Sequence, residues 1–157
     1  MRRPRELQTR PILNATTSRT KTLIPLRSVQ RLHALTPRFD EVRALCDALD
    51  STGLYPFAVE CAHPLDVHAR QFPRASGYPE DAATGIAAAA LLYGAVYYGL
   101  LASGASGASG APGVTVHQGY ALGKPSCICV EPRDPDDSGA GCWISGTVDR
   151  MTLAPLP

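Results

Sequence analysis

The spacing of apolar and polar residues along the chain predicts a domain that mixes helices with strands. Apolar residues at helical spacing predict a short helix capped by Ser28 and a longer helix capped by Asp40, which we expect to end at Gly53. The polar stretch 133–140 is typical of a hairpin turn. Apolar runs and alternating patterns rich in β-branched residues predict strands at 22–26, 54–61, 66–72, 114–119, 126–132 and 142–148.

The stretch 84–101 is apolar on every side of a helix. A helix without a polar face must be surrounded by protein, and the four alanines at 87–90 would let strands approach it closely. Its most apolar window, 86–101, is about 16 residues long and falls short of the roughly 20 that a membrane span needs. We therefore expect no membrane association, but an α+β fold in which a curved, mixed or antiparallel sheet, a half-barrel, wraps around this central helix.

Outside these elements the pattern weakens. Residues 1–20 are basic and are expected to form a poorly ordered tail, and 151–157 form a second tail. Between them, 21–150 is expected to be one folded lobe. Within it, the Ala/Ser/Gly repeat at 102–113 is expected to be a flexible loop.

Charge and cysteine content narrow the function classes. The net charge of +1 provides no overall field for nucleic acid or an anionic membrane, and we expect the basic tail to be solvated. The start has no apolar signal segment, and Pro4 and Pro11 interrupt the amphipathic helix that a mitochondrial address would need. Five cysteines without CxxC spacing fit a reduced protein. We therefore expect a cytoplasmic location.

The segment 80–88, EDAATGIAA, carries the most specific motif. It resembles the signature of the PhzF-like family, Glu-Asp-Pro-x-Thr-Gly-Ser-Ala. Arg70 and Phe72 precede it as in the family's Arg-x-Phe strand, and a Gln-Gly step at 118–119 and a Gly-Lys-Pro-Ser turn at 123–126 follow it. Several segments thus match in order.

The resemblance implies a diaminopimelate-epimerase-like fold, in which two similar lobes each wrap a sheet around a helix. It also implies an isomerase without a cofactor that moves protons on carbon acids in the cleft between the lobes. This chain resembles the carboxy-terminal lobe over about residues 20–150, and the first lobe, with its catalytic glutamate, is not found in it. We therefore expect either a first-lobe chain as partner or self-association into a homo-oligomer.

The same resemblance assigns site residues. Asp81 would act as general acid or base on a small carboxylic or amino acid. The start of the central helix offers free N–H groups and a favourable dipole for the carboxylate of such a substrate. The substrate-binding residues expected there and on the opposite wall are Thr84, Gly85, Ile86, Gln118 and Gly119.

The sequence leaves open whether the chain is catalytic and what several of these residues do. Ala82 stands where the family has proline, and Ile86 replaces a serine whose hydroxyl would hold substrate or relay a proton. The alternative function is therefore a truncated or degenerate domain that binds a small acid or a partner without catalysis. Asp81 could also be a helix N-cap, Glu80 a solvated acid or one that complements the helix dipole, and Gln118 an exposed strand residue.

No metal or other cofactor is expected. The CxC thiols at 127 and 129 share one face of a strand, and a hairpin could place Cys142 opposite them, but buried core cysteines are commoner than a thiolate metal site. His63 and His68, with Asp66 between them, would suit a metal only on an irregular loop.

Overall fold

The computed structural model describes residues 10–101, 113–134 and 136–147. Its elements, in chain order, are β1 (Leu13–Thr16), β2 (Thr20–Pro25), α1 (Val29–His33), α2 (Phe39–Ala48), β3 (Gly53–Ala62), β4 (Leu65–Ala69), β5 (Phe72–Pro73), α3 (Gly85–Tyr97), β6 (Val114–Gln118), η2 (Tyr120–Leu122), β7 (Ser126–Pro132), η3 (Ser138–Ala140) and β8 (Cys142–Ser145). The loop expected at 102–113 falls outside the described residues except for its last position, and the tail at 151–157 falls outside them entirely.

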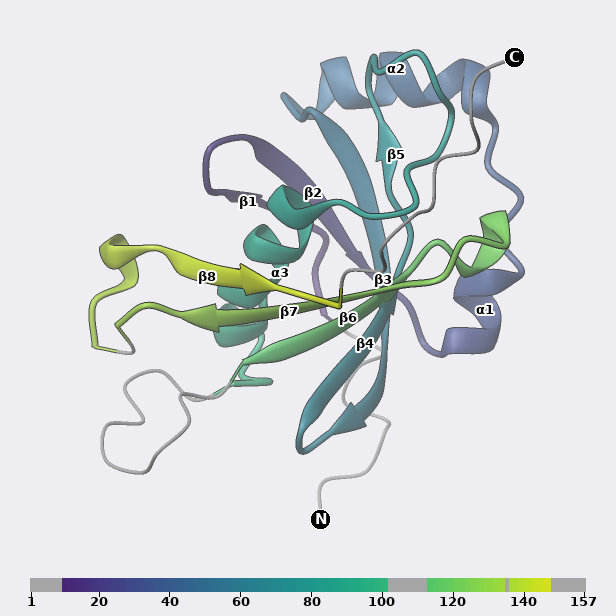
Figure 1. Cartoon of the computed structure of the whole chain (residues 1–157). Coiled ribbons are helices and arrows are strands. Elements are labelled where there is room, and N and C mark those ends of the chain that lie inside the picture. The colour runs from purple at the N-terminus through teal and green to yellow at the C-terminus, as the bar shows by residue number, and fades with distance from the viewer. Residues whose placement is uncertain (1–9, 102–112, 135, 148–157) are drawn as a thin grey trace, which may run out of the picture.

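The eight strands found in the described ranges form one mixed sheet in the order β1-β2-β3-β4-β6-β7-β8, with β5 paired to β3. The pairs β2–β3 and β4–β6 are parallel and the others antiparallel. The sheet curls so that β1, β2, β7 and β8 all approach α3 (Figure 1). The expected α+β architecture, a curved sheet around a central apolar helix, is confirmed.

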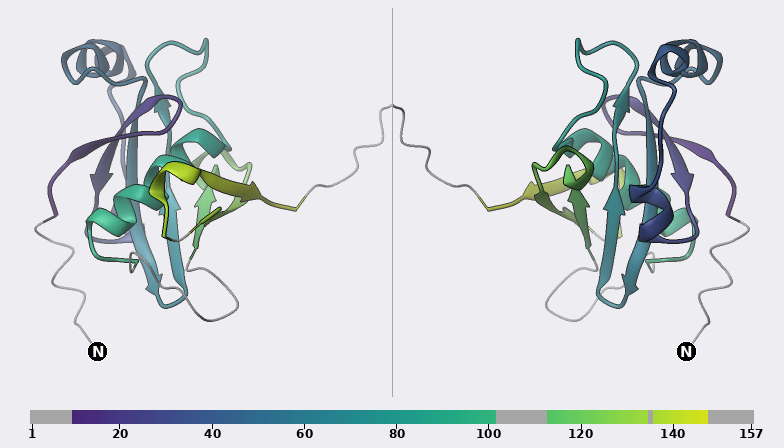
Figure 2. Two further views of the ribbon diagram at one scale, coloured as in Figure 1. Left: turned by 90° about the vertical axis from the view of Figure 1, so that its left-hand side faces the viewer. Right: turned by 90° about the vertical axis from the view of Figure 1, so that its right-hand side faces the viewer.

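Helix α3 is buried along most of its length, as its sequence predicted. Ala87, Ala88, Ala90 and Leu91 have no accessible surface and pack in one cluster with Leu23 and other sheet residues. Helices α1 and α2 lie on the opposite face of the sheet from α3 (Figure 2). Because successive strand residues point to opposite faces of the sheet, β3 contributes side chains to the cores on both faces. Its Leu54 belongs to the smaller core under α2, whereas Tyr55 contacts the α3 cluster.

Several local boundaries differ from those expected. Strand β1 lies within the stretch expected to be a basic tail, where it pairs with β2, so ordered chain begins before residue 21. Ser28 caps α1 as predicted, since its Oγ accepts a hydrogen bond from the N–H of Arg31. Asp40 is not the cap of α2 but lies in its first turn, where its charge still complements the helix dipole. That helix ends at Ala48 instead of continuing toward Gly53.

The stretch 66–72, expected to be one strand, is divided. Strand β4 ends at Ala69 and β5 begins at Phe72, so that Arg70 and Gln71 lie between two strands that both pair with β3. The hairpin predicted around 133–140 is confirmed, because β7 and β8 are antiparallel neighbours. Within the described ranges, none of the helices has the length and apolar character to traverse a bilayer.

Candidate active site at the start of the central helix

A buried ion pair holds the segment that leads into α3. The Arg70 guanidinium donates from Nε to Glu80 Oε1 at 2.8 Å and from Nη2 to Glu80 Oε2 at 2.7 Å. Arg70 is 5% exposed and Glu80 is 7% exposed, so the expectation of a solvated Glu80 is wrong. The charge partner that keeps this carboxylate inside the protein is ten residues away in the sequence. Arg70 Nη1 also donates to the carbonyl of Leu35 at 2.8 Å, which ties the pair to the end of α1.

Asp81 follows this ion pair directly and is fixed through its backbone and its side chain. Its N–H donates to the carbonyl of Gln71 at 3.0 Å, which forms an isolated β-bridge. Its Oδ2 accepts a hydrogen bond of 2.6 Å from the hydroxyl of Thr84. The N-cap position of α3 belongs to Thr84, not to Asp81, so the interpretation of Asp81 as the cap is wrong. The half-buried Asp81 carboxylate therefore has a set orientation beside the start of the helix.

The first amides of α3 are available to a ligand. The N–H groups of Ala87 and Ala88 already bond to the carbonyl of Thr84. No described residue accepts a hydrogen bond from the N–H of Gly85 or of Ile86. Free N–H groups at a helix N-terminus, together with the helix dipole, favour an anion.

Gln118 supports Asp81 from the end of β6. It is fully buried, so the alternative of an exposed strand residue is wrong. Its Oε1 accepts a hydrogen bond of 2.9 Å from the Tyr55 hydroxyl, and its Nε2 donates to the carbonyl of Asp81 at 2.8 Å and to the Thr84 hydroxyl oxygen at 3.1 Å. Burial raises the pKa of Tyr55, which keeps this phenol protonated as the donor. Contact of Gln118 with a substrate stays a prediction.

Gly119 needs to be glycine for two reasons. Its φ of +80° lies in the left-handed region. A Cβ at this position would also stand 2.8 Å from the carbonyl oxygen of Ala82 and would overlap the carbonyl oxygen of Lys124. The Ser126 hydroxyl donates to the same Ala82 carbonyl at 2.8 Å. The turn after β6 therefore packs directly on the segment that carries Asp81.

A pocket of about 290 Å³ opens beside these groups. Asp81, Thr84 and Ile86 line it, whereas Gly85, Gln118 and Gly119 do not contribute to its wall. Sequence reasoning missed the other polar lining residues, which are Arg19, Lys21, Thr52, Gln71, Arg74, Ser76 and Tyr78.

Lys21 is the least expected of these residues. It lies in strand β2 and is only 6% exposed. Burial lowers the pKa of its ammonium and the nearby Arg19 lowers it further, whereas the negative charge of Asp81 acts in the opposite direction. The one available signal was the placement of a cation among strand residues. A pattern of one strand does not show which partners surround it.

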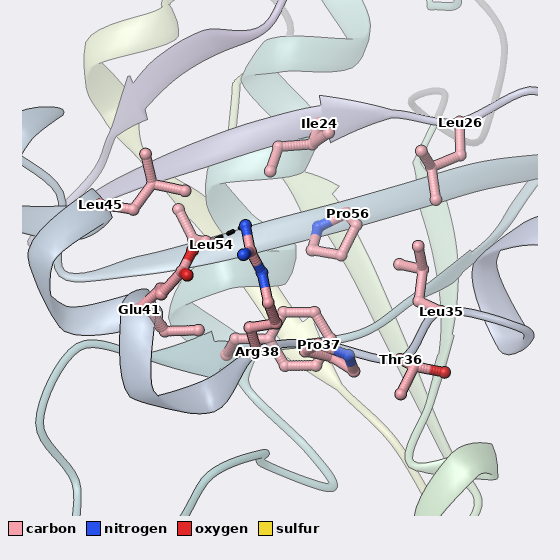
Figure 3. Close-up of a pocket in the computed structure, with 12 residues that line it drawn as sticks. Ile24, Leu26, Leu35, Thr36, Pro37, Arg38, Glu41, Leu45, Leu54 and Pro56 are labelled. Carbon is pink, nitrogen blue, oxygen red and sulfur yellow. Dashed lines mark ion pairs between the residues drawn. The ribbon is translucent and has the colours of Figure 1, made fainter.

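A second pocket, also of about 290 Å³, lies under α2 and has a different character. Its lining is mostly aliphatic and includes Ile24, Leu45 and Leu54 (Figure 3). The ion pair between Arg38 and Glu41, with nitrogen and oxygen 2.8 Å apart, is drawn there as a dashed line. None of the candidate site residues lines this pocket, so the polar pocket beside Asp81 is the stronger candidate for the chemistry.

The structure does not bring together, in one metal site, the cysteine and histidine side chains that were considered as metal ligands. Cys127 is exposed, which contradicts its placement in the core, and Cys142 lies opposite Pro132 instead of opposite the CxC pair. The His68 Nε2 lies 2.9 Å from Glu60 Oε2. Within the described ranges, no group of three or more His, Cys, Asp or Glu side chains is arranged to hold a metal ion.

Comparison with known sequences adds to this geometry. The sequence model of the family described as phenazine biosynthesis-like protein, PhzC-PhzF, matches residues 3–147. The chain belongs to this family. Among its relatives, the uncharacterised isomerase YddE of Escherichia coli K12 is 30% identical over 137 residues, which is 87% of this chain and 44% of YddE. An uncharacterised isomerase of Clostridium acetobutylicum is 30% identical over 131 residues, which is 83% of this chain and 42% of that protein.

Solved structures show the same fold. A PhzF-family phenazine biosynthesis protein of Bacillus anthracis superposes with a TM-score of 0.60 at 20% identity, over 85% of this chain and 44% of that chain. A protein of Pseudomonas aeruginosa described as a predicted epimerase gives a TM-score of 0.59 at 21% identity, over 96% of this chain and 48% of that one. The expected diaminopimelate-epimerase-like lobe is thus confirmed. The PhzF-family chain spans less than half the length of the curated relatives it matches.

Proposed function

We propose that this chain is a lobe of a PhzF-like, cofactor-independent isomerase or epimerase that moves a proton on a small carboxylic or amino acid. The observation that carries the proposal is the position of Asp81. Its carboxylate faces a pocket, is oriented by the Thr84 hydroxyl, and lies next to the free amides at the start of α3. The family's relatives named as isomerases support the same class of reaction.

In the proposed reaction the substrate carboxylate accepts hydrogen bonds from the N–H groups of Gly85 and Ile86. These dipoles stabilise the negative charge that spreads onto the carboxylate when the neighbouring carbon loses its proton. Asp81 takes this proton through the carboxylate oxygen that Thr84 does not bind. A second acid then gives a proton back to carbon, either on the opposite face or on a conjugated position, so that no net charge or atom is lost.

The second acid would come from another lobe. The PhzF-like family supplies a glutamate from its first lobe, and we propose that such a lobe, or a second copy of this chain, covers the pocket. Exposed apolar side chains support this proposal: Ile86, Trp143 and Ile144 are each more than one-third exposed. A Cβ at Gly85 would lie 3.4 Å from Ile144 Cδ1, so this apolar surface reaches the start of α3.

One residue favours the non-catalytic alternative. Ile86 lines the pocket where the family has serine, so no hydroxyl is available at this position to hold substrate or relay a proton. A lobe that binds a small acid through the helix start, without turnover, would keep the anion site and tolerate this change.

The test is exchange of the α-proton of small carboxylic and amino acids in D2O, followed by NMR, with the full chain alone and with a separately produced first lobe. We expect Asp81→Asn to slow exchange by about 10²–10⁴-fold, the range that general acid–base groups contribute. The control Asp40→Asn, on the exposed first turn of α2, should leave it unchanged. Absence of exchange under both conditions would exclude the enzyme, and exchange that survives Asp81→Asn would exclude this assignment.

The partner proposal has a separate test. Light scattering of the chain at micromolar concentration should show self-association, because an apolar surface of this kind is normally covered. A clean monomer at that concentration would count against it.

A further inference from the structure

Lys21 is a buried cationic side chain that lacks a counterion among the described residues. It is 6% exposed, and among residues 10–101, 113–134 and 136–147 no carboxylate lies within ion-pair distance of its ammonium. A buried charge is costly unless an opposite charge or several hydrogen bonds compensate it. Since Lys21 lines the pocket beside Asp81, the missing partner can arrive there from solution.

Gln71 is the second buried polar group that lacks a partner in the described part of the chain. It is 1% exposed, and neither its Nε2 nor its Oε1 finds a hydrogen-bond partner in the described residues. Buried side-chain amides are nearly always hydrogen-bonded, so a group with both atoms free calls for an explanation. Gln71 lines the same pocket as Lys21.

Gly53 brings the two groups together. A Cβ built on Gly53 would lie 3.2 Å from Lys21 Nζ and would overlap Gln71 Nε2, so both nitrogens occupy the space that a side chain would fill. Gln71 also accepts the backbone hydrogen bond of Asp81, which places the pair next to the proposed acid–base group. The two donors therefore lie side by side at Gly53, next to the segment that carries Asp81.

The charge balance of the pocket points the same way. Three cations line it, Arg19, Lys21 and Arg74, against the single carboxylate of Asp81. Arg74 is neutralised by its ion pair with Asp47. Arg19 and Lys21 against Asp81 then leave one net positive charge, in addition to the N–H groups and dipole that would hold the first carboxylate at the start of α3.

We propose that Lys21 and Gln71 form a second anion subsite and that the substrate is a small diacid. This rests on the proposed function, in which the first carboxylate occupies the start of α3. The second carboxylate accepts hydrogen bonds from Lys21 Nζ and Gln71 Nε2, and a hydroxyl or amino group of the ligand donates to Gln71 Oε1. The reacting carbon then lies between the two acid groups, beside Asp81.

The test uses two probes that differ in one group. Malate and 2-hydroxybutyrate have the same four-carbon chain and hydroxyl, but a methyl group in 2-hydroxybutyrate replaces the second carboxylate. Calorimetric titration of the full chain should give malate an affinity about tenfold or more higher, the effect of charge-assisted hydrogen bonds to a desolvated carboxylate. Lys21→Met and Gln71→Leu should each remove most of this preference and leave the weak binding of 2-hydroxybutyrate unchanged.

Two further variants make the result decisive. Lys21→Arg keeps a cation and should retain part of the preference, which separates the loss of charge from a general disturbance of β2. Arg43→Met, on the exposed face of α2 and outside the pocket, should change nothing. The circular dichroism spectrum of each variant checks that it is folded.

Equal affinity for the two probes, including the case in which neither binds, would overturn the diacid subsite. A malate preference that survives both Lys21→Met and Gln71→Leu would overturn the assignment to these residues. The proposed function can fail independently of the subsite. If the malate preference depends on Lys21 but proton exchange is unchanged in Asp81→Asn, the subsite is supported and the proposed chemistry at Asp81 is not.

Discussion

The ion pair between Arg70 and Glu80 gives the sharpest prediction about the scaffold of the site. Glu80→Ala removes a carboxylate that binds the guanidinium through two hydrogen bonds of 2.7 and 2.8 Å. The Arg70 guanidinium has no route to solvent, since Arg70 is 5% exposed. The variant therefore leaves a buried cation whose remaining described partners are two backbone carbonyls near the end of α1 and the face of the Phe72 ring.

The expected magnitude follows from this burial. Removing one partner of a buried pair destabilises a protein by about 3–5 kcal/mol. The matched control is Glu41→Ala, which breaks the ion pair between Glu41 and Arg38. In that pair the Arg38 side chain is 78% exposed and the Glu41 side chain is 53% exposed. Exposed pairs are worth about 0–1 kcal/mol, so the two glutamate variants should differ by at least about 2 kcal/mol.

Urea unfolding at pH 7, followed by circular dichroism, measures both free energies. The double variant Arg70→Met with Glu80→Leu should recover much of the loss, because apolar side chains of similar volume can replace a buried pair. If Glu80→Ala costs no more than Glu41→Ala, Glu80 is solvated in solution and the argument from burial is refuted.

Three further predictions concern other parts of the lobe. Gly77→Ala should lower the free energy of unfolding by about 1–2 kcal/mol, which is the strain of a left-handed φ. Gly119→Ala should lower it clearly more, because a Cβ at Gly119 also meets backbone atoms whereas one at Gly77 meets nothing. Urea unfolding compares the two variants, and equal costs would contradict the packing described for Gly119. Tyr55→Phe should cost about 1–3 kcal/mol in the same assay, since buried Gln118 loses its donor; a neutral change would disprove that bond. Burial lowers the pKa of His33 from its usual value of 6.5. As the pH falls, the unfolded chain therefore protonates at His33 before the folded chain does. Stability should therefore fall as the pH drops below about 6.5, and less steeply in His33→Asn; identical slopes would refute this.

Sequence alone predicts best those elements whose own residues show that they must be buried. Helix α3 is apolar all round, and this property forces it to be enclosed whatever the rest of the fold does. Strand β1 has no such pattern: of its four residues only Ala15 is buried, and the strand exists because β2 offers it a partner. A short strand of this kind is defined by its pairing and not by its own residues.

The candidate site divides in the same way. Asp81 and Thr84 could be named because they stand in one short motif, and the structure places them 2.6 Å apart, oxygen to oxygen. Lys21 and Gln71 come from two other segments, and nothing in either segment indicates that they meet at Gly53. The environment of Glu80 was missed for the same physical reason, since burial of a charge depends on a partner that only the fold supplies.

The hydrogen bonding around Asp81 shows where a ligand belongs and leads to a last prediction about stability. On the scaffold side the polar groups are satisfied, as the bonds of Gln118 and the Arg70–Glu80 pair show. On the pocket side Lys21 has no counterion among the described residues and Gln71 has two unpartnered atoms there. Groups kept unsatisfied for function destabilise the free protein, so Gln71→Leu should raise the free energy of unfolding by about 0.5–2 kcal/mol, the opposite sign to Tyr55→Phe. Urea unfolding without ligand measures this change, and a loss of stability in Gln71→Leu would mean that its amide has a partner inside the protein.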